Sequence, residues 1–234
     1  MKVAQEFSRY APYYNNYNVI QNKVAKKLVS DMRVKPKKIL DLGCGSGAIY
    51  NEISWELESF LGVDFAKGML EQHPQAKNIT CKYGDFNKEA FFEDLKNENF
   101  DYIISASALQ WSDDLDFVFK SLASFEVPLS LAIFTCKTFD TLYKTAKLKP
   151  LLRCSDSIIE NAKVYFDASY ELVSYTLEFE SKKELFRYVK RSGVSGNRRV
   201  LDYKQTKALM QEYPHKSLEF EVLFMHSIPK MFFF

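Results

Sequence analysis

A glycine-rich turn between a predicted strand and a predicted helix constrains this chain more than any other feature. Residues 38–42 (KILDL) form a short apolar run typical of a buried strand, and residues 43–47 (GCGSG) follow at once. Glycines at 43, 45 and 47 allow positive φ and leave room for a ligand to approach the backbone. In an open α/β sheet, ligands bind beyond the carboxyl ends of the strands. The turn therefore predicts a ligand site at that edge of a sheet.

Strands and helices alternate around this turn. An amphipathic helix is predicted over 19–33, since apolar residues recur there at helical spacing while lysines face outward. Strands are predicted at 38–42, 60–63, 79–83, 100–104 and 129–135, with helices between them at 48–56, 66–73, 87–96 and 113–124. Five strands separated by helices indicate parallel βαβ units and a doubly wound α/β fold.

The last 100 residues are less regular. They predict helices at 138–162, 182–191 and 203–212, and strands at 171–179 and 218–225. We therefore expect a single domain over 1–234 with a mostly parallel seven-stranded sheet. An N-terminal helix at 1–35 and small helical lid segments at about 138–165 and 182–212 complete this prediction.

Charge, hydropathy and cysteines exclude several classes of protein. A formal net charge of +2 is too small to indicate nucleic-acid binding, and no stretch has the apolar length of a membrane span. The chain begins without an apolar signal segment, which predicts a cytoplasmic location. Four cysteines without C-x-x-C spacing predict reduced thiols and no metal site, rather than a disulfide or zinc framework.

Acidic residues end three consecutive predicted strands. Asp41 precedes the glycines, where a carboxylate would repel a pyrophosphate but suits the ammonium group of a methionine moiety. Asp64 ends the second strand, the expected place for an acid that binds both ribose hydroxyls. Asp85 and Phe86 follow the third strand and offer a carboxylate and a ring to an adenine. Each Asp alone is more often a helix cap or turn former, but three in register indicate a nucleoside site.

These segments, ILDLGCGSG at 39–47, GVD at 62–64 and GDF at 84–86, resemble the class I S-adenosylmethionine (SAM) dependent methyltransferases. The resemblance spans residues 38–135 and implies a Rossmann-like fold and SAM as cofactor. The residues expected to bind SAM are Asp41, Gly43, Cys44, Gly45, Gly47, Asp64, Phe65, Met69, Asp85, Phe86 and Ser105.

Three further blocks resemble one family of these enzymes, the malonyl-acyl-carrier-protein O-methyltransferases of biotin synthesis. They are Phe7 to Gln21, Ser105 to Trp111 with its Leu-Gln-Trp, and Leu185 to Phe224. The Leu-Gln-Trp segment is shared with the trans-aconitate methyltransferases. The chain departs from the family at Asn15, usually Asp, and matches it poorly over 138–165. The resemblance implies methyl transfer to the free carboxylate of a malonyl thioester on acyl carrier protein.

A carboxylate acceptor is already ionised at neutral pH, so no general base is expected. It does need a cation or strong donors, and an arginine fork suits it best. Arg198 and Arg199 are the candidates, with Tyr14, Gln110 and Trp111 as further positioning residues. The alternative for the two arginines is a solvated loop.

The predicted helix at 182–191 carries Lys183, Arg187, Lys190 and Arg191 on one face. Acyl carrier proteins are strongly acidic, so a basic helix near the site entrance would attract them. The alternative is an ordinary solvated face.

Two other functions stay open. One is a methyltransferase of another small carboxylic acid, of the trans-aconitate type, or of another small molecule. The other is a SAM-binding regulatory or assembly protein without catalysis. A nucleic-acid methyltransferase is disfavoured, because no N/D-P-P-Y/F segment follows the fourth predicted strand.

Overall fold

The computed structural model describes residues 18–191 and 203–229, and these form one seven-stranded sheet in the order β3-β2-β1-β4-β5-β7-β6. The strands are β1 (Lys38–Leu42), β2 (Ser59–Asp64), β3 (Ile79–Tyr83), β4 (Tyr102–Ala106), β5 (Leu129–Phe134), β6 (Phe166–Glu178) and β7 (Ser217–Pro229). Strands β1 to β5 pair in parallel, whereas β7 is antiparallel to both β5 and β6. The predicted doubly wound, mostly parallel seven-stranded sheet is confirmed.

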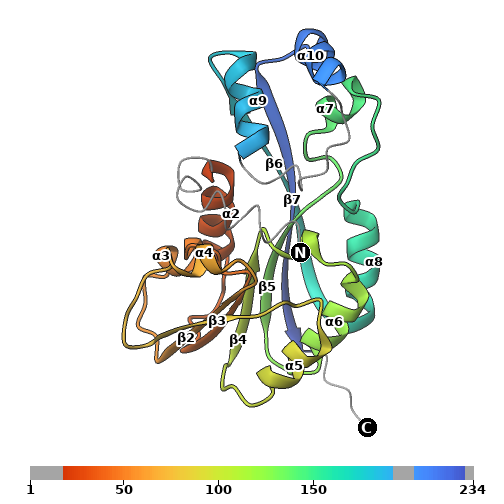
Figure 1. Ribbon diagram of the computed structural model, residues 1–234. Coiled ribbons are helices and arrows are strands. Elements are labelled where there is room, and N and C mark those ends of the chain that lie inside the picture. Colours follow the sequence, from red (N-terminus) through yellow and green to blue (C-terminus); the bar gives the residue numbers. More distant parts are fainter. Residues whose placement is uncertain (1–17, 192–202, 230–234) are drawn as a thin grey trace.

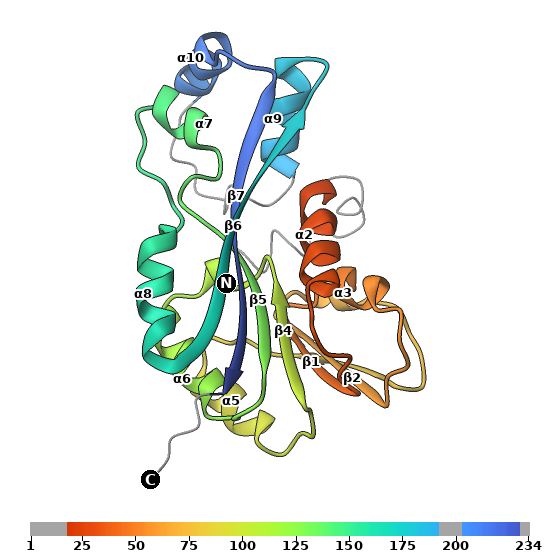
Figure 2. The same ribbon diagram turned by 180° about the vertical axis from the view of Figure 1, so that it is seen from behind.

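Helices cover both faces of the sheet (Figures 1 and 2). On one face lie α2 (Val19–Ser30) and α3 (Ala48–Glu52), and on the other lie α5 (Glu89–Leu95), α6 (Leu115–Ala123) and α8 (Ser155–Tyr165). The short α4 (Lys67–Leu70) follows β2, and a 3₁₀ turn η1 (Leu109–Trp111) follows β4. Helix α2 buries an apolar stripe, since its Ile20, Val24 and Leu28 have no exposed surface.

Strands β6 and β7 extend beyond the rest of the sheet. Strand β5 pairs with β7 only from Val222 to Ser227, whereas β6 pairs with it from Ser217 to Pro229. The residues past the end of β5, 174–178 and 217–221, form a two-stranded ribbon. Three helices gather along it: α7 (Asp140–Thr145), α9 (Lys182–Arg191) and α10 (Tyr203–Glu212) (Figure 1). We call this ribbon with its three helices the arm.

Two predictions for the segment after β5 are wrong. The single helix predicted at 138–162 is two helices, α7 and α8, separated by an irregular stretch. Lys147 adopts a positive φ of 54° after α7, and Pro150 follows. Proline lacks the backbone donor and forces its predecessor out of helical geometry, so the helix cannot continue.

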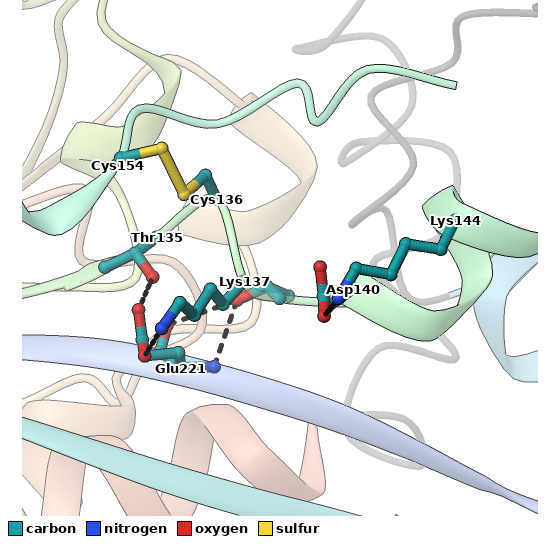
Figure 3. Close-up of polar contacts among 8 residues, drawn as sticks. Thr135, Cys136, Lys137, Asp140, Lys144, Cys154 and Glu221 are labelled. Carbon is teal, nitrogen blue, oxygen red and sulfur yellow. Dashed lines mark hydrogen bonds and ion pairs between the residues drawn. A yellow bond between two sulfur atoms is a disulfide. The ribbon is translucent and has the colours of Figure 1, made fainter. Parts of the chain in front are cut away.

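The cysteines of this segment form a disulfide, contrary to the prediction of reduced thiols. Cys136, just after β5, is bonded to Cys154, just before α8 (Figure 3). Cys44 and Cys81 are free. Disulfide pairing depends on approach in space, and a separation of 18 residues with no recognisable motif does not reveal it.

Within the described ranges, no helix combines the length and the apolar character needed to cross a membrane. The same residues contain no group of three or more histidine, cysteine or acidic side chains placed to hold a metal ion.

Candidate cofactor site

A cavity lies at the carboxyl ends of β1, β2 and β4, where the strand order reverses. Its floor is the glycine loop between β1 and α3, and the start of α2 and the turn η1 contribute to its walls. The lining residues are Asn18, Gln21, Asp41, Gly43, Cys44, Gly45, Ser46, Ala48, Ile49, Asp64, Phe65, Met69, Ala106, Ser107, Ala108 and Trp111. This is the edge of the sheet at which the sequence predicts a ligand.

At two positions of the loop, a neighbouring side chain lies so close to the backbone that only glycine fits. Gly43 has a φ of 75°, and a Cβ added there would lie 2.2 Å from the Cβ of Ala108. Gly47 has a φ of 89°, and its added Cβ would lie 2.5 Å from the Cδ of Pro74. Left-handed backbone is costly for other residues, and such contacts exclude any side chain. The loop is therefore packed closely against Ala108 after β4 and against Pro74 after α4.

Asp64 at the end of β2 is held by the backbone around it. Its Oδ2 accepts from the Gly45 amide at 3.0 Å and its Oδ1 from the Ala66 amide at 2.7 Å. Burial raises the pKa of Asp64 to about 6, against the opposing effect of backbone hydrogen bonds from Ala66, Gly45 and Phe65. An ionised carboxylate can accept about four hydrogen bonds. The remaining capacity of Asp64 is available to ligand hydroxyls at the cavity wall.

Asp41 at the end of β1 is in a different state. Its carboxyl is 1% exposed, and neither oxygen has a hydrogen-bond partner among the described residues. Burial, and then the nearby charges of Asp64 and Cys81, raise the pKa of Asp41 well above its usual value. A buried acid without a partner is costly, and a bound cation or set of donors would compensate it. The site fits a ligand that brings an ammonium group to Asp41.

Several predicted cofactor residues lie outside the lining of this cavity. The Ser105 hydroxyl donates to the Leu42 carbonyl at 2.6 Å, so it joins β4 to β1. Asp85 Oδ1 accepts from the backbone amide and from the side chain of Asn87, both at 3.0 Å. The Phe86 ring is buried and meets the Phe65 ring edge-on at 6.5 Å. Gly47 begins α3 behind the loop. Their contacts with the cofactor stay predictions.

The predicted substrate residues are only partly described. Trp111 lines the cavity. Gln110 is 8% exposed, and its Nε2 donates to the Ser107 carbonyl at 2.6 Å. Tyr14, Arg198 and Arg199 lie outside the described residues. On α9, Lys183 and Arg187 are exposed, whereas the side chains of Lys190 and Arg191 are not described.

The prediction missed Asn18 and Gln21, which bring the start of α2 to the cavity. The signal was present in the sequence. Gln21 shares a helical face with Val24, Ala25 and Leu28, all buried, so it is a polar residue on an apolar stripe. Such a residue either finds a partner or faces a site.

Known proteins match this chain in its cofactor region and beyond. Residues 39–126 match the family described as "Methyltransferase domain". A malonyl-[acyl-carrier protein] O-methyltransferase of Halalkalibacterium halodurans is 30% identical over 158 residues, 61% of this chain and 57% of the relative. A malonyl-[acyl-carrier protein] O-methyltransferase 2 of Ilyobacter polytropus is 28% identical over 202 residues, 80% of this chain and 75% of the relative. The chain thus spans little more than half of the first relative.

Solved structures share the fold. The YcgJ protein of Bacillus subtilis superposes with a TM-score of 0.62 at 12% identity, over 86% of this chain and 95% of that one. Phosphoethanolamine N-methyltransferase 2 of Haemonchus contortus, in complex with S-adenosyl-L-methionine, gives a TM-score of 0.52 at 14% identity, over 91% of this chain and 53% of that one.

The strand order with its antiparallel β7 and the glycine loop are those of the class I methyltransferase fold, and residues 39–126 match a methyltransferase domain of the SAM-dependent kind. The cofactor of such a domain is SAM. Among curated proteins, the distant relatives of this chain include malonyl-acyl-carrier-protein O-methyltransferases at 25–30% identity.

Proposed function

We propose that this chain transfers a methyl group from SAM to the free carboxylate of a malonyl thioester on acyl carrier protein. The product would be the methyl ester that starts pimeloyl chain synthesis for biotin. The observation that supports this proposal is the extent of the similarity. It continues beyond the cofactor motifs and reaches 80% of the chain for one malonyl-acyl-carrier-protein O-methyltransferase.

Methyl transfer of this kind needs little from the protein beyond placement. SAM supplies an electrophilic methyl group on a sulfonium. In our proposal Asp41 binds its ammonium group and Asp64 its ribose hydroxyls, while the loop backbone at Gly43 and Gly45 lies against it. The malonyl carboxylate is already ionised, so no group of the chain has to remove a proton. Holding two reactants in line can supply roughly 7–11 kcal/mol of the barrier reduction.

The acceptor needs its own binding groups, because the cofactor wall of the cavity is acidic. We assign the acceptor carboxylate to Arg198 or Arg199, whose planar forks match it. Trp111 lines the cavity, and the neighbouring Gln110 is 8% exposed. With Tyr14, these two residues would orient the malonyl group.

Helix α9 is the proposed docking site for the carrier protein. Leu185 and Tyr188 are buried in the core of the arm, at 0% and 4% exposure, whereas Lys183 and Arg187 are exposed. Lys144 of α7, also in the arm, has a side chain that is 75% exposed and pairs with Asp140 at 2.6 Å, which offsets part of its charge. Exposed lysine and arginine side chains on the arm would attract an acidic carrier protein and raise the rate at which the two proteins meet.

A methyl-transfer assay with radiolabelled SAM tests the proposal. Malonyl carrier protein, malonyl coenzyme A and free malonate are compared as acceptors at equal concentration. We expect the highest kcat/KM with malonyl carrier protein. Faster methylation of free malonate or trans-aconitate would indicate a small-acid methyltransferase instead. SAM binding without transfer to any acceptor would indicate a SAM-binding protein that is not an enzyme.

A further inference from the structure

Gln21 presents an unusual group to the cofactor cavity. It lies in the first turn of α2, it is 7% exposed, and it lines the same cavity as Asp41. Its Oε1 is buried and has no hydrogen-bond partner among the described residues. A buried carbonyl oxygen without a donor is destabilising, so an oxygen of this kind in a cavity is expected to accept a hydrogen bond from a ligand.

Three side chains that line this cavity have buried oxygens without a partner among the described residues: Gln21, Asp41 and Ser107. The Ser107 hydroxyl can donate as well as accept, whereas the Gln21 amide oxygen and an ionised Asp41 only accept. Asp41 contributes two carboxylate oxygens without partners, and Gln21 contributes one amide oxygen. Asp64, on the same wall, already accepts two backbone amides. A ligand group that satisfies Asp41 and Gln21 together must donate several hydrogen bonds and carry positive charge. An alkylammonium, with three donors and no acceptor, meets both requirements.

We infer that Gln21 is a cofactor-positioning residue that accepts a hydrogen bond, through Oε1, from the α-ammonium of the methionine moiety, which Asp41 also binds. The assignment joins α2 to the cofactor site and gives this helix a second role besides its core packing. It rests on the cofactor alone and not on the proposed acceptor. An assay that finds no methyl transfer to malonyl carrier protein would therefore not contradict the role inferred for Gln21.

The opposite orientation of the side chain amide makes a different prediction. If Nε2 faced the cavity, Gln21 would donate to the methionine carboxylate instead. Replacing Gln21 with Glu separates the two arrangements, because a carboxylate only accepts when ionised. It would bind an ammonium at least as well and would repel a carboxylate.

The test uses two ligands that differ in the amino-acid moiety. S-adenosylhomocysteine carries the α-ammonium, whereas 5′-methylthioadenosine lacks the whole amino-acid portion. Binding of both is measured by calorimetry on the full chain at pH 8 for wild type and the variants Q21M, Q21E and D41N. The exposed Gln211 of α10 supplies a matched control, Q211M, and thermal melts report folding.

We expect Q21M to weaken S-adenosylhomocysteine binding by roughly 10- to 100-fold, as for a lost hydrogen bond to a charged group. Methylthioadenosine affinity should change less than about twofold. D41N should show the same ligand-selective loss, and Q21E should bind S-adenosylhomocysteine as tightly as wild type or more so. An unchanged ratio of the two affinities in Q21M would overturn the inference. So would a Q21E variant, folded by thermal melt, that loses S-adenosylhomocysteine while keeping methylthioadenosine.

Discussion

Two carboxyl groups with little exposed surface, one in the cofactor half and one in the arm, differ in how their hydrogen bonds are satisfied. In the cofactor half, formed by β1 to β4 and the glycine loop, Asp41 has no partner and its pKa is raised by burial. In the arm, Glu221 of β7, with a side chain 12% exposed, accepts from the Thr135 hydroxyl and lies 4.0 Å from the Lys137 ammonium (Figure 3). Asp41 needs donors from a bound ligand, whereas Glu221 receives its hydrogen bond and its counter-charge from side chains of the protein itself. In the arm, Glu219 accepts from the Thr141 hydroxyl through one oxygen and leaves only the other without a partner among the described residues. A carboxyl with neither oxygen satisfied, as in Asp41, therefore indicates the site better than the presence of an acid does.

The largest expected effect falls on the loop. In Gly43→Ala the added methyl would overlap Ala108 and the residue would keep a left-handed φ. Overpacking of about 1–3 kcal/mol and a backbone cost of about 1–2 kcal/mol should together lower the unfolding free energy and SAM affinity. Gly45→Ala is the comparison: it shares the left-handed backbone cost at a φ of 52°, but its Cβ meets only the flexible end of Met69 at 3.3 Å, so the difference between the variants reports the overlap with Ala108. Equal melting temperatures for the two variants would show that the loop is not tightly constrained.

The next effect concerns the acceptor. Replacing the responsible arginine, Arg198 or Arg199, with alanine should lower kcat/KM for malonyl carrier protein by about 2–4 kcal/mol, because a desolvated carboxylate loses its partner. SAM affinity should stay the same, which separates the acceptor site from the cofactor half. Wild-type rates in both variants would show that other groups hold the carboxylate.

The unpaired acid predicts a trade-off between stability and binding. Since burial raises the pKa of Asp41 in the folded state, its favourable contribution is present below about pH 4 and is lost as pH rises toward the folded pKa. Asp41→Asn should therefore stabilise the ligand-free protein at pH 8 by on the order of 1 kcal/mol, and less at pH 5. Thermal melts at both pH values measure this. Exposed Asp94→Asn is the control, and a D41N variant less stable than wild type at pH 8 would contradict the account.

The smallest effect is expected on the arm. Reversing Lys183 and Arg187 to Glu should raise KM for malonyl carrier protein several-fold, since exposed charges contribute less than about 1 kcal/mol each. Turnover at saturation should change little, and the wild-type rate should fall with added salt. The control reverses Lys77 and Lys88, which are exposed on the cofactor half. An equal rise in KM for malonyl coenzyme A would show that α9 does not dock a carrier.

The same two regions differ in how far the sequence predicts them. Strands β1 to β5 are buried and bounded by turns, so their apolar runs locate them, and the acids at their ends follow from the parallel topology. Strand β6 begins at Phe166, five residues before the predicted start, because Asp167 and Ser169 on its exposed edge obscure the pattern. Contacts between residues far apart in the sequence determine three further features: the break after α7, the Cys136–Cys154 bond and the place of Gln21 at the cavity. The local pattern of apolar residues therefore does not predict them.

We expect the cofactor to bind at the strand ends through the acids that the fold places there, Asp41 and Asp64. Calorimetric titration of wild type and Asp64→Ala with SAM at pH 8, above the raised pKa of about 6, tests it most directly. We expect one site per chain in wild type and a loss of about 1.5–3 kcal/mol in the variant, the size of a charged hydrogen bond. Unchanged affinity in a folded Asp64→Ala protein, or no SAM binding by wild type, would contradict the account.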